Sequence, residues 1–103
     1  MDMNKLMQQA QQMQKKMAEV QDGLAEKTID AESGGGMVKV VFNGRQELVS
    51  LSIDPSVINP EEADLLEDLL LAALQEGHKK STRMAQEEMG QIAGGMGLPP
   101  GLF

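Results

Sequence analysis

The chain has 103 residues, no cysteine, two aromatic residues (Phe42 and Phe103) and a formal net charge of −7. The lack of cysteine excludes a disulfide framework and a thiolate metal site. Because neither a charged leader nor a stretch of ~20 apolar residues occurs, we expect a soluble, untargeted, cytoplasmic protein. A chain of this length buries only a modest fraction of its surface alone, so a second copy is a natural source of burial, while the negative charge would ordinarily argue against nucleic acid.

An amphipathic pattern opens the chain. Seven apolar residues recur at alternating spacings of three and four, which is typical of a helix that packs along its length. Good helix formers fill the positions between them, and Gly23 marks where the helix should begin to fail, so we predict a long helix over about 3–21. We interpret the stripe as core and not as a Met-rich docking surface. Its members are Met3, Leu6, Ala10, Met13, Met17, Val20 and Leu24.

The period then changes from that of a helix to that of strands. Alternating polar and apolar residues come next, and the glycine-containing run 33–36 breaks them, so we predict a strand and a turn. Residues 37–42 are rich in β-branched side chains, and Asn43-Gly44 should supply the positive φ angles of a tight hairpin turn. A third strand over 48–53 completes an antiparallel meander whose apolar face the two long helices should cover. The residues expected on that face of the third strand are Val49, Leu51 and Ile53.

Helix signals return after the meander. Asp54-Pro55 and Asn59-Pro60 each place a capping side chain before a proline suited to a first helical turn. A broad apolar face follows, and one helix could continue to about residue 90, with a break at Gly77 as the competing interpretation. A glycine at that position would also let another helix approach closely.

The last segment differs in composition from the rest of the chain. Residues 94–103 contain Gly-Gly, Gly, Pro-Pro and Gly, which propagate neither a helix nor a strand. We therefore expect one α+β domain over 1–93, in the order long helix, three-stranded antiparallel meander, long helix. A flexible Gly/Pro-rich tail over 94–103 should follow it.

Catalytic and metal-binding patterns are missing from the sequence. His78 is the only histidine, and there is no cysteine nucleophile or tyrosine proton donor. The glycine run 34–36 lacks the Lys-Ser/Thr of a phosphate loop, and the acids of the second helix lack the spacing of a calcium loop. We expect no enzyme, no metal, no cofactor and no small-molecule substrate. For His78 we expect a solvated surface position, with a phosphate contact as the alternative.

The charges are segregated along the chain. Every charged residue in the stretch 47–76 is an acid, whereas basic residues gather just after it and in the first helix, so the net charge hides two basic segments. The basic segment of the second helix does not by itself indicate a partner, because cations also solvate a helix face and complement the helix dipole. The basic residues are Lys5, Lys15 and Lys16 in the first helix and Lys79, Lys80 and Arg83 in the second.

Several motifs occur in a fixed order along these elements. They are Met3-Asn4-Lys5-Leu6-Met7, Gly34-Gly35-Gly36-Met37-Val38-Lys39-Val40, Asn43-Gly44 and Ile53-Asp54-Pro55-Ser56. Together with the order of the elements they resemble, over essentially the whole chain, the YbaB/EbfC family of nucleoid-associated proteins. The resemblance implies an intertwined, tweezer-like homodimer that binds duplex DNA with little or variable sequence preference. It also implies a place in the nucleoid and a role in nucleoid organisation and gene expression.

The resemblance also indicates where DNA would be contacted. The family places its contacts on the first and last long helices, which here carry Lys5, Lys15, Lys16, Lys79, Lys80 and Arg83. Since the chain has no aromatic platform for single strands and no helix suited to base readout, contact with the phosphate backbone of a duplex is the default mechanism. The acids must then lie away from the contacting surface.

The apolar residues give the candidate contacts between two copies. These are Leu6, Met13, Met17, Val20, Leu66 and Leu70. The alternative function is that of a helical protein-binding adaptor or chaperone, which would use its Met-rich helices and bind no nucleic acid. Neither function involves a membrane.

Overall fold

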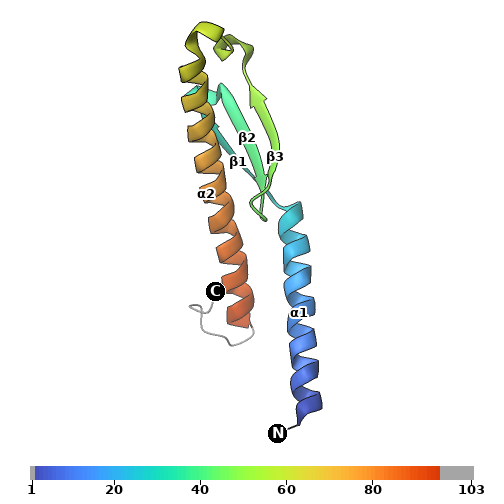
Figure 1. Ribbon diagram of the computed structural model, residues 1–103. Coiled ribbons are helices and arrows are strands. Elements are labelled where there is room, and N and C mark those ends of the chain that lie inside the picture. Colours follow the sequence, from blue (N-terminus) through green and yellow to red (C-terminus); the bar gives the residue numbers. More distant parts are fainter. Residues whose placement is uncertain (1, 96–103) are drawn as a thin grey trace.

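The computed structural model describes residues 2–95, with side chains over 2–91 (Figure 1). Two long helices flank three strands in the order that the sequence predicts, so the α+β prediction is confirmed. The elements are α1 (Met3–Glu26), β1 (Thr28–Ser33), η1 (Gly34–Gly36), β2 (Val38–Asn43), β3 (Leu48–Ile53), η2 (Pro55–Val57), η3 (Pro60–Glu62) and α2 (Ala63–Gly95), of which the η elements are short 3-10 turns.

Helix α1 is longer than predicted. Its first turn is capped by the side chain of Asp2, which accepts the backbone N–H of Asn4 at 3.0 Å. The helix continues past the predicted end at about residue 21 and through Gly23, and it stops only where Lys27 adopts an extended conformation. A β-carbon at Gly23 would meet nothing within 4 Å, so this glycine lowers helix stability by its flexibility alone, and that cost does not end the helix.

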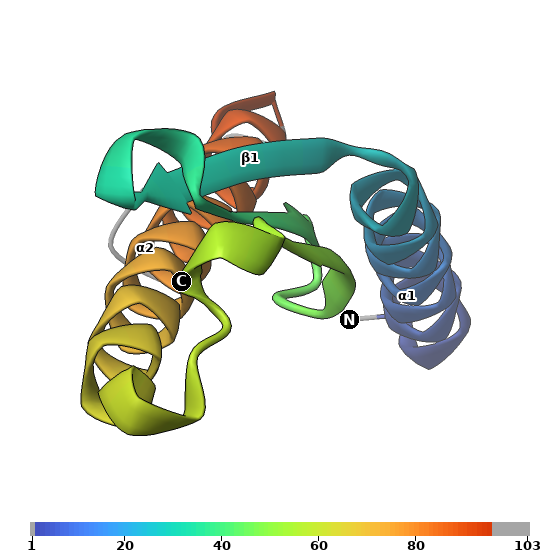
Figure 2. The same cartoon turned by 90° about the horizontal axis from the view of Figure 1, so that it is seen from above.

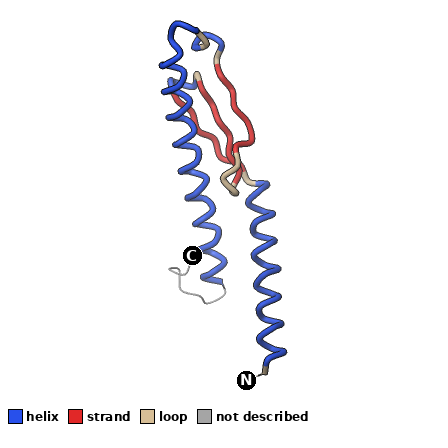
Figure 3. The backbone as a smooth tube through the Cα atoms, in the orientation of Figure 1, coloured by secondary structure: helices blue, strands red, loops and turns tan. Residues whose placement is uncertain are grey.

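The strands form one antiparallel sheet in the order β1-β2-β3 (Figure 3). Val40 in the central strand pairs with Ala31 on one side and with Leu51 on the other. Directly opposed residues of antiparallel strands point to the same face, so these three side chains belong to one apolar face. The sheet is therefore the meander that the sequence predicts.

The pairing of β2 with β3 contains one irregularity, which changes the predicted face of β3. Phe42 lies opposite Leu48, while the residues before it pair in regular register. As a result Leu48 joins Leu51 and Ile53 on the apolar face, and Val49 lies within the irregularity. A β-bulge of this kind adds one residue to a strand and reverses the alternation on one side of it.

Helix α2 alone covers the sheet within the chain. The core comprises Ala31, Val38, Val40, Phe42 and Ala73. Helix α1 instead projects past the end of the sheet, and the views in Figures 1 and 2 show it well separated from the sheet face that α2 covers. The expectation that both helices cover the sheet is therefore wrong for a single chain, and the β3 side of the apolar face stays open.

Helix α2 is continuous through Gly77, which decides against a break there. A β-carbon at Gly77 would lie 2.6 Å from Cδ2 of Phe42 and 3.0 Å from Cγ2 of Val40. The absence of a side chain at Gly77 therefore allows the sheet, and not another helix, to pack closely against α2. The helix also includes Gly94 and Gly95, which were expected in the tail; the remainder of the predicted tail, 96–103, lies outside the described residues.

The turn between β2 and β3 differs from the predicted one. The positive φ falls on Gln46, at 64°, and among the described residues the other positive values belong to the three glycines of η1 and not to Gly44. Gly44 is needed for close packing, because a β-carbon there would lie 2.7 Å from the backbone oxygen of Leu24.

Two side-chain caps lead into α2, as predicted. Asp54 accepts the backbone N–H of Ser56 at 2.9 Å, and Asn59 accepts that of Glu61 at 3.0 Å. They begin the short turns η2 and η3, which precede α2, and each is followed by a proline. The hydrogen bonds from Ser56 hold the pKa of Asp54 below its usual value of 3.8.

Candidate nucleic-acid interface

The cations of α1 lie on an exposed helix that projects from the sheet (Figure 1). Lys5, Lys15 and Lys16 are all exposed. Gln9 and Gln12 lie between Lys5 and Lys16 at spacings of three or four, which return to the same side of a helix. Gln9, Gln12 and Lys16 also line one shallow hollow. The helix thus presents a polar stripe with a cation at each end.

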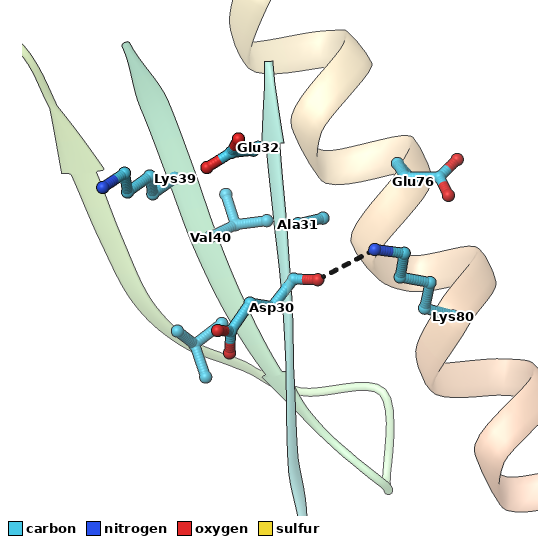
Figure 4. A pocket seen from close by; sticks show the side chains of 8 residues that line it. Asp30, Ala31, Glu32, Lys39, Val40, Glu76 and Lys80 are labelled. Carbon is cyan, nitrogen blue, oxygen red and sulfur yellow. Dashed lines mark hydrogen bonds between the residues drawn. The ribbon is translucent and has the colours of Figure 1, made fainter. Parts of the chain in front are cut away.

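The three predicted cations of α2 are not equivalent. Lys79 and Arg83 are exposed, whereas Lys80 is half-buried. The ammonium group of Lys80 donates to the backbone carbonyl of Asp30 at 3.2 Å, as Figure 4 shows, and Glu76 lies one turn earlier on the side that faces β1. Lys80 is therefore partly engaged within the chain, and Lys79 and Arg83 present the more available charges of this group.

His78 lies on the same stretch of α2. Its ring is 6.3 Å from the ring of Phe42 and meets it edge-on at 78°. The imidazole is exposed, and with Leu74 and Lys79 it lines an open hollow beside the sheet. The surface position agrees with the expectation from the sequence.

The acids of the stretch 47–76 are concentrated at one end of the molecule. Six of the eight lie at the residue before η2, on η3 and on the first turns of α2, at the end opposite the free end of α1 (Figure 1). These six acids are Asp54, Glu61, Glu62, Asp64, Glu67 and Asp68. Glu88, farther along α2 and outside this stretch, forms an ion pair with Lys27. The separation explains how a chain of net charge −7 keeps cations on exposed helix surfaces.

The six apolar candidates for contacts between copies divide into two groups. The four on α1 have little of the chain packed against them: Leu6 is 42 % exposed, and the other three are half-buried. The two on α2 pack against the chain's own core. The first group is Leu6, Met13, Met17 and Val20, and the second is Leu66 and Leu70.

The structure adds one cation that the sequence did not single out. Arg45 is exposed in the β2–β3 turn, at the end of the sheet from which α1 projects (Figure 1). A lone arginine in a hairpin turn carries no periodic signal, so only the folded arrangement places it near the C-terminal end of α1 and the middle of α2. By contrast Lys27, another cation at this end, is paired with Glu88.

Within the described part of the chain, no helix is long and apolar enough to cross a membrane. Over the same residues, no three His, Cys, Asp or Glu side chains gather in a way that could hold a metal ion.

Comparisons with known proteins agree on one family. The model of the YbaB/EbfC DNA-binding family matches residues 1–96. A nucleoid-associated protein of Syntrophobacter fumaroxidans is 52 % identical over 101 residues, covering 94 % of this chain and 92 % of its own. One of Pelotomaculum thermopropionicum is 44 % identical over 102 residues, covering 99 % and 96 %. The crystal structure of the uncharacterized protein HP0035 from Helicobacter pylori matches with a TM-score of 0.76 and 32 % identity, covering 93 % of this chain and 97 % of that one.

The fold is a helix–meander–helix architecture, and the family whose model it matches is a family of small DNA-binding proteins. The family match covers nearly all of the chain, and relatives named nucleoid-associated proteins match it over almost their full length. The chain belongs to the YbaB/EbfC DNA-binding family.

Proposed function

We propose that the protein binds duplex DNA as a homodimer, mainly through the phosphate backbone, and contributes to nucleoid organisation and gene expression in the cytoplasm. The observation that carries the proposal is the placement of exposed cations on both long helices, with the acidic end of the molecule away from the free end of α1. Cations that neutralise phosphates release condensed counterions, and this release drives binding that depends little on sequence.

The dimer is supported by the shape of a single chain. Its radius of gyration is 19.3 Å and its extents are 69 × 21 × 16 Å, whereas a compact chain of about 100 residues has a radius of gyration of about 13 Å. Its accessible surface is 7372 Å², against about 5,700 Å² for a compact protein of this mass. The excess surface favours a second copy as the source of the missing burial.

The apolar surface left open within the chain supports the same proposal. Leu48 and Leu51 are 47 % and 46 % exposed although they lie on the core face of the sheet. On α1 the apolar stripe likewise lacks a covering element. Contiguous apolar surface of this kind is rare in monomers, and a dimer interface above ~2,000 Å² would cover it.

A titration of random-sequence duplex DNA with the purified protein, followed by fluorescence anisotropy at several salt concentrations, tests the proposal. We expect binding at low salt whose affinity falls steeply between about 50 and 200 mM, because each neutralised phosphate adds about 0.9 to the slope of log affinity against log salt. Absence of binding at low salt would contradict it. The exposed Met-rich stripe of α1 would then favour the protein-binding adaptor.

A further inference from the structure

The β2–β3 turn is fixed against the end of α1. The backbone N–H of Gly44 donates to the carbonyls of Leu24, at 2.8 Å, and Lys27, at 3.0 Å. Leu24 is itself only 2 % exposed. The turn therefore caps carbonyls at the C-terminal end of α1. These hydrogen bonds fix the position of the turn relative to that end of the helix.

The same turn is held on its other side by α2. Ser81, which is fully buried, donates its hydroxyl to the backbone carbonyl of Asn43 at 2.5 Å. Within the turn, Oδ1 of Asn43 accepts the backbone N–H groups of Arg45, at 2.9 Å, and Glu47, at 3.1 Å. In Figures 1 and 2 the turn lies between the two long helices. The C-terminal end of α1 and the middle of α2 thus determine where its tip lies.

The tip carries an exposed cation. Among the side chains of residues 2–91, the only ion pair joins Lys27 to Glu88. In that part of the chain, therefore, no carboxylate lies within ion-pair distance of the Arg45 guanidinium. A guanidinium presents several donors in a rigid plane that matches a phosphate group. Arg45 therefore offers a phosphate-binding group on a turn whose backbone is held by both helices.

The backbone beside Arg45 is strained. Gln46 has a φ of 64°, a conformation that glycine or asparagine adopts at lower cost. Its side chain is exposed, so packing within the chain does not account for a glutamine here. Such strain persists where the surrounding structure determines it, and it is concentrated at functional sites.

We infer that the Asn43–Glu47 turn is a third DNA-contacting element, in which the guanidinium of Arg45 donates to a phosphate oxygen of a duplex held along α1 and α2. This inference rests on the proposed function. The anchors are Ser81 and Leu24, which act by positioning the turn and do not touch the duplex. Gln46 keeps the tip in the conformation that presents Arg45.

The test compares two variants that remove the same charge from different places. Arg45→Gln removes the tip cation, and Lys39→Gln removes an exposed cation from the sheet face that points away from α2. Binding of a random-sequence duplex is measured by anisotropy at several salt concentrations. We expect Arg45→Gln to weaken binding several-fold at low salt and to reduce the slope of log affinity against log salt by about 0.9 for each protomer whose Arg45 contacts a phosphate. Lys39→Gln should leave that slope unchanged.

A third variant tests whether the conformation of the turn matters for DNA binding or only for the stability of the fold. Gln46→Gly removes the strain and should raise the melting temperature, yet it loosens the tip and should lower DNA affinity. A turn with only a structural role would show the higher melting temperature with unchanged affinity, and that result contradicts the inference.

The outcomes also distinguish this inference from the function on which it rests. The inference about the turn is wrong, and the proposed function stands, if the parent binds DNA and Arg45→Gln has the same salt slope as the parent. The same conclusion follows if Lys39→Gln lowers the salt slope as much as Arg45→Gln does. If the parent shows no salt-dependent binding, both fail.

Discussion

Gly77 of α2 and Phe42 of β2 lie so close together that a β-carbon on the glycine would be 2.6 Å from the aromatic Cδ2. Gly77→Ala should therefore lower the free energy of unfolding by about 1–3 kcal/mol through overpacking, although alanine is the better helix former by about 1 kcal/mol. The matched control is Gly90→Ala in the same helix, where a β-carbon would meet nothing within 4 Å. It should be neutral or stabilising by up to about 1 kcal/mol. Thermal unfolding of both variants at equal concentration checks the pair, and equal effects would contradict the packing argument.

Ser81 should contribute to stability through its buried hydroxyl. Ser81→Ala removes the donor to the Asn43 carbonyl and should cost about 1 kcal/mol, the usual net worth of one hydrogen bond. Thr82→Ala, one residue farther along α2, removes a hydroxyl from a half-buried position and should change stability by less than about 0.5 kcal/mol. Urea unfolding measures both. A cost at Thr82 equal to that at Ser81 would mean that the Asn43 bond is unimportant.

The cations of α2 should contribute unequally to DNA binding. The double variant Lys79→Ala with Arg83→Ala should lower the salt slope by up to about 1.8 for each protomer of the dimer, at about 0.9 for each phosphate contact. Lys80→Ala should lower it less, because the Lys80 ammonium already donates to Asp30. Anisotropy titrations at several salt concentrations provide the slopes. A larger loss for Lys80→Ala than for the double variant would reverse this order.

Association should depend on the apolar stripe of α1. Met17→Asp places an unpaired charge in that stripe, and burying it against a second copy would be costly, so the dimer should dissociate or unfold. Sedimentation equilibrium at micromolar concentration measures the mass. Gln14→Asp introduces the same charge at an exposed position of the same helix and should leave the mass unchanged. A folded monomer for the parent chain would refute the dimer itself.

The cap at Asp54 should give a small acid dependence of stability. The pKa of Asp54 is lowered in the folded state, so its stabilising contribution is present above the unfolded value and is lost as the pH falls through the folded one. Asp54→Asn keeps an oxygen acceptor for the Ser56 N–H but does not titrate. The stability difference between parent and variant should therefore shrink below about pH 3.8, which urea unfolding over a pH series measures. A difference that grows on acidification would contradict this sign.

Local patterns in the sequence predict most of this fold. The change of apolar period separates α1 from the strands, and the pairs Asp54-Pro55 and Asn59-Pro60 mark the turns before α2, because these signals depend on neighbouring residues only. The pattern places the end of α1 too early, since Gly23 lowers helix stability but three more residues remain helical.

The features that the sequence could not predict depend on contacts between distant residues. The sequence pattern predicts a turn glycine at Gly44, yet the glycine is needed for close packing against Leu24, twenty residues earlier in the chain, and the positive φ lies on Gln46. The irregularity beside Phe42 likewise follows from the pairing of two strands. For the candidate site, the basic segments were visible as charge clusters, but the engagement of Lys80 with β1 and the position of Arg45 required the fold.

The bond between Lys80 and the Asp30 carbonyl also affects how the sheet can grow. Asp30 lies on β1, an edge strand, and edge strands offer unpaired backbone groups to strands of other chains. The ammonium group occupies one of these acceptors and places a charge where an incoming strand would have to lie. Strand addition is thereby disfavoured along β1, which leaves β3 as the edge at which another strand meets less resistance.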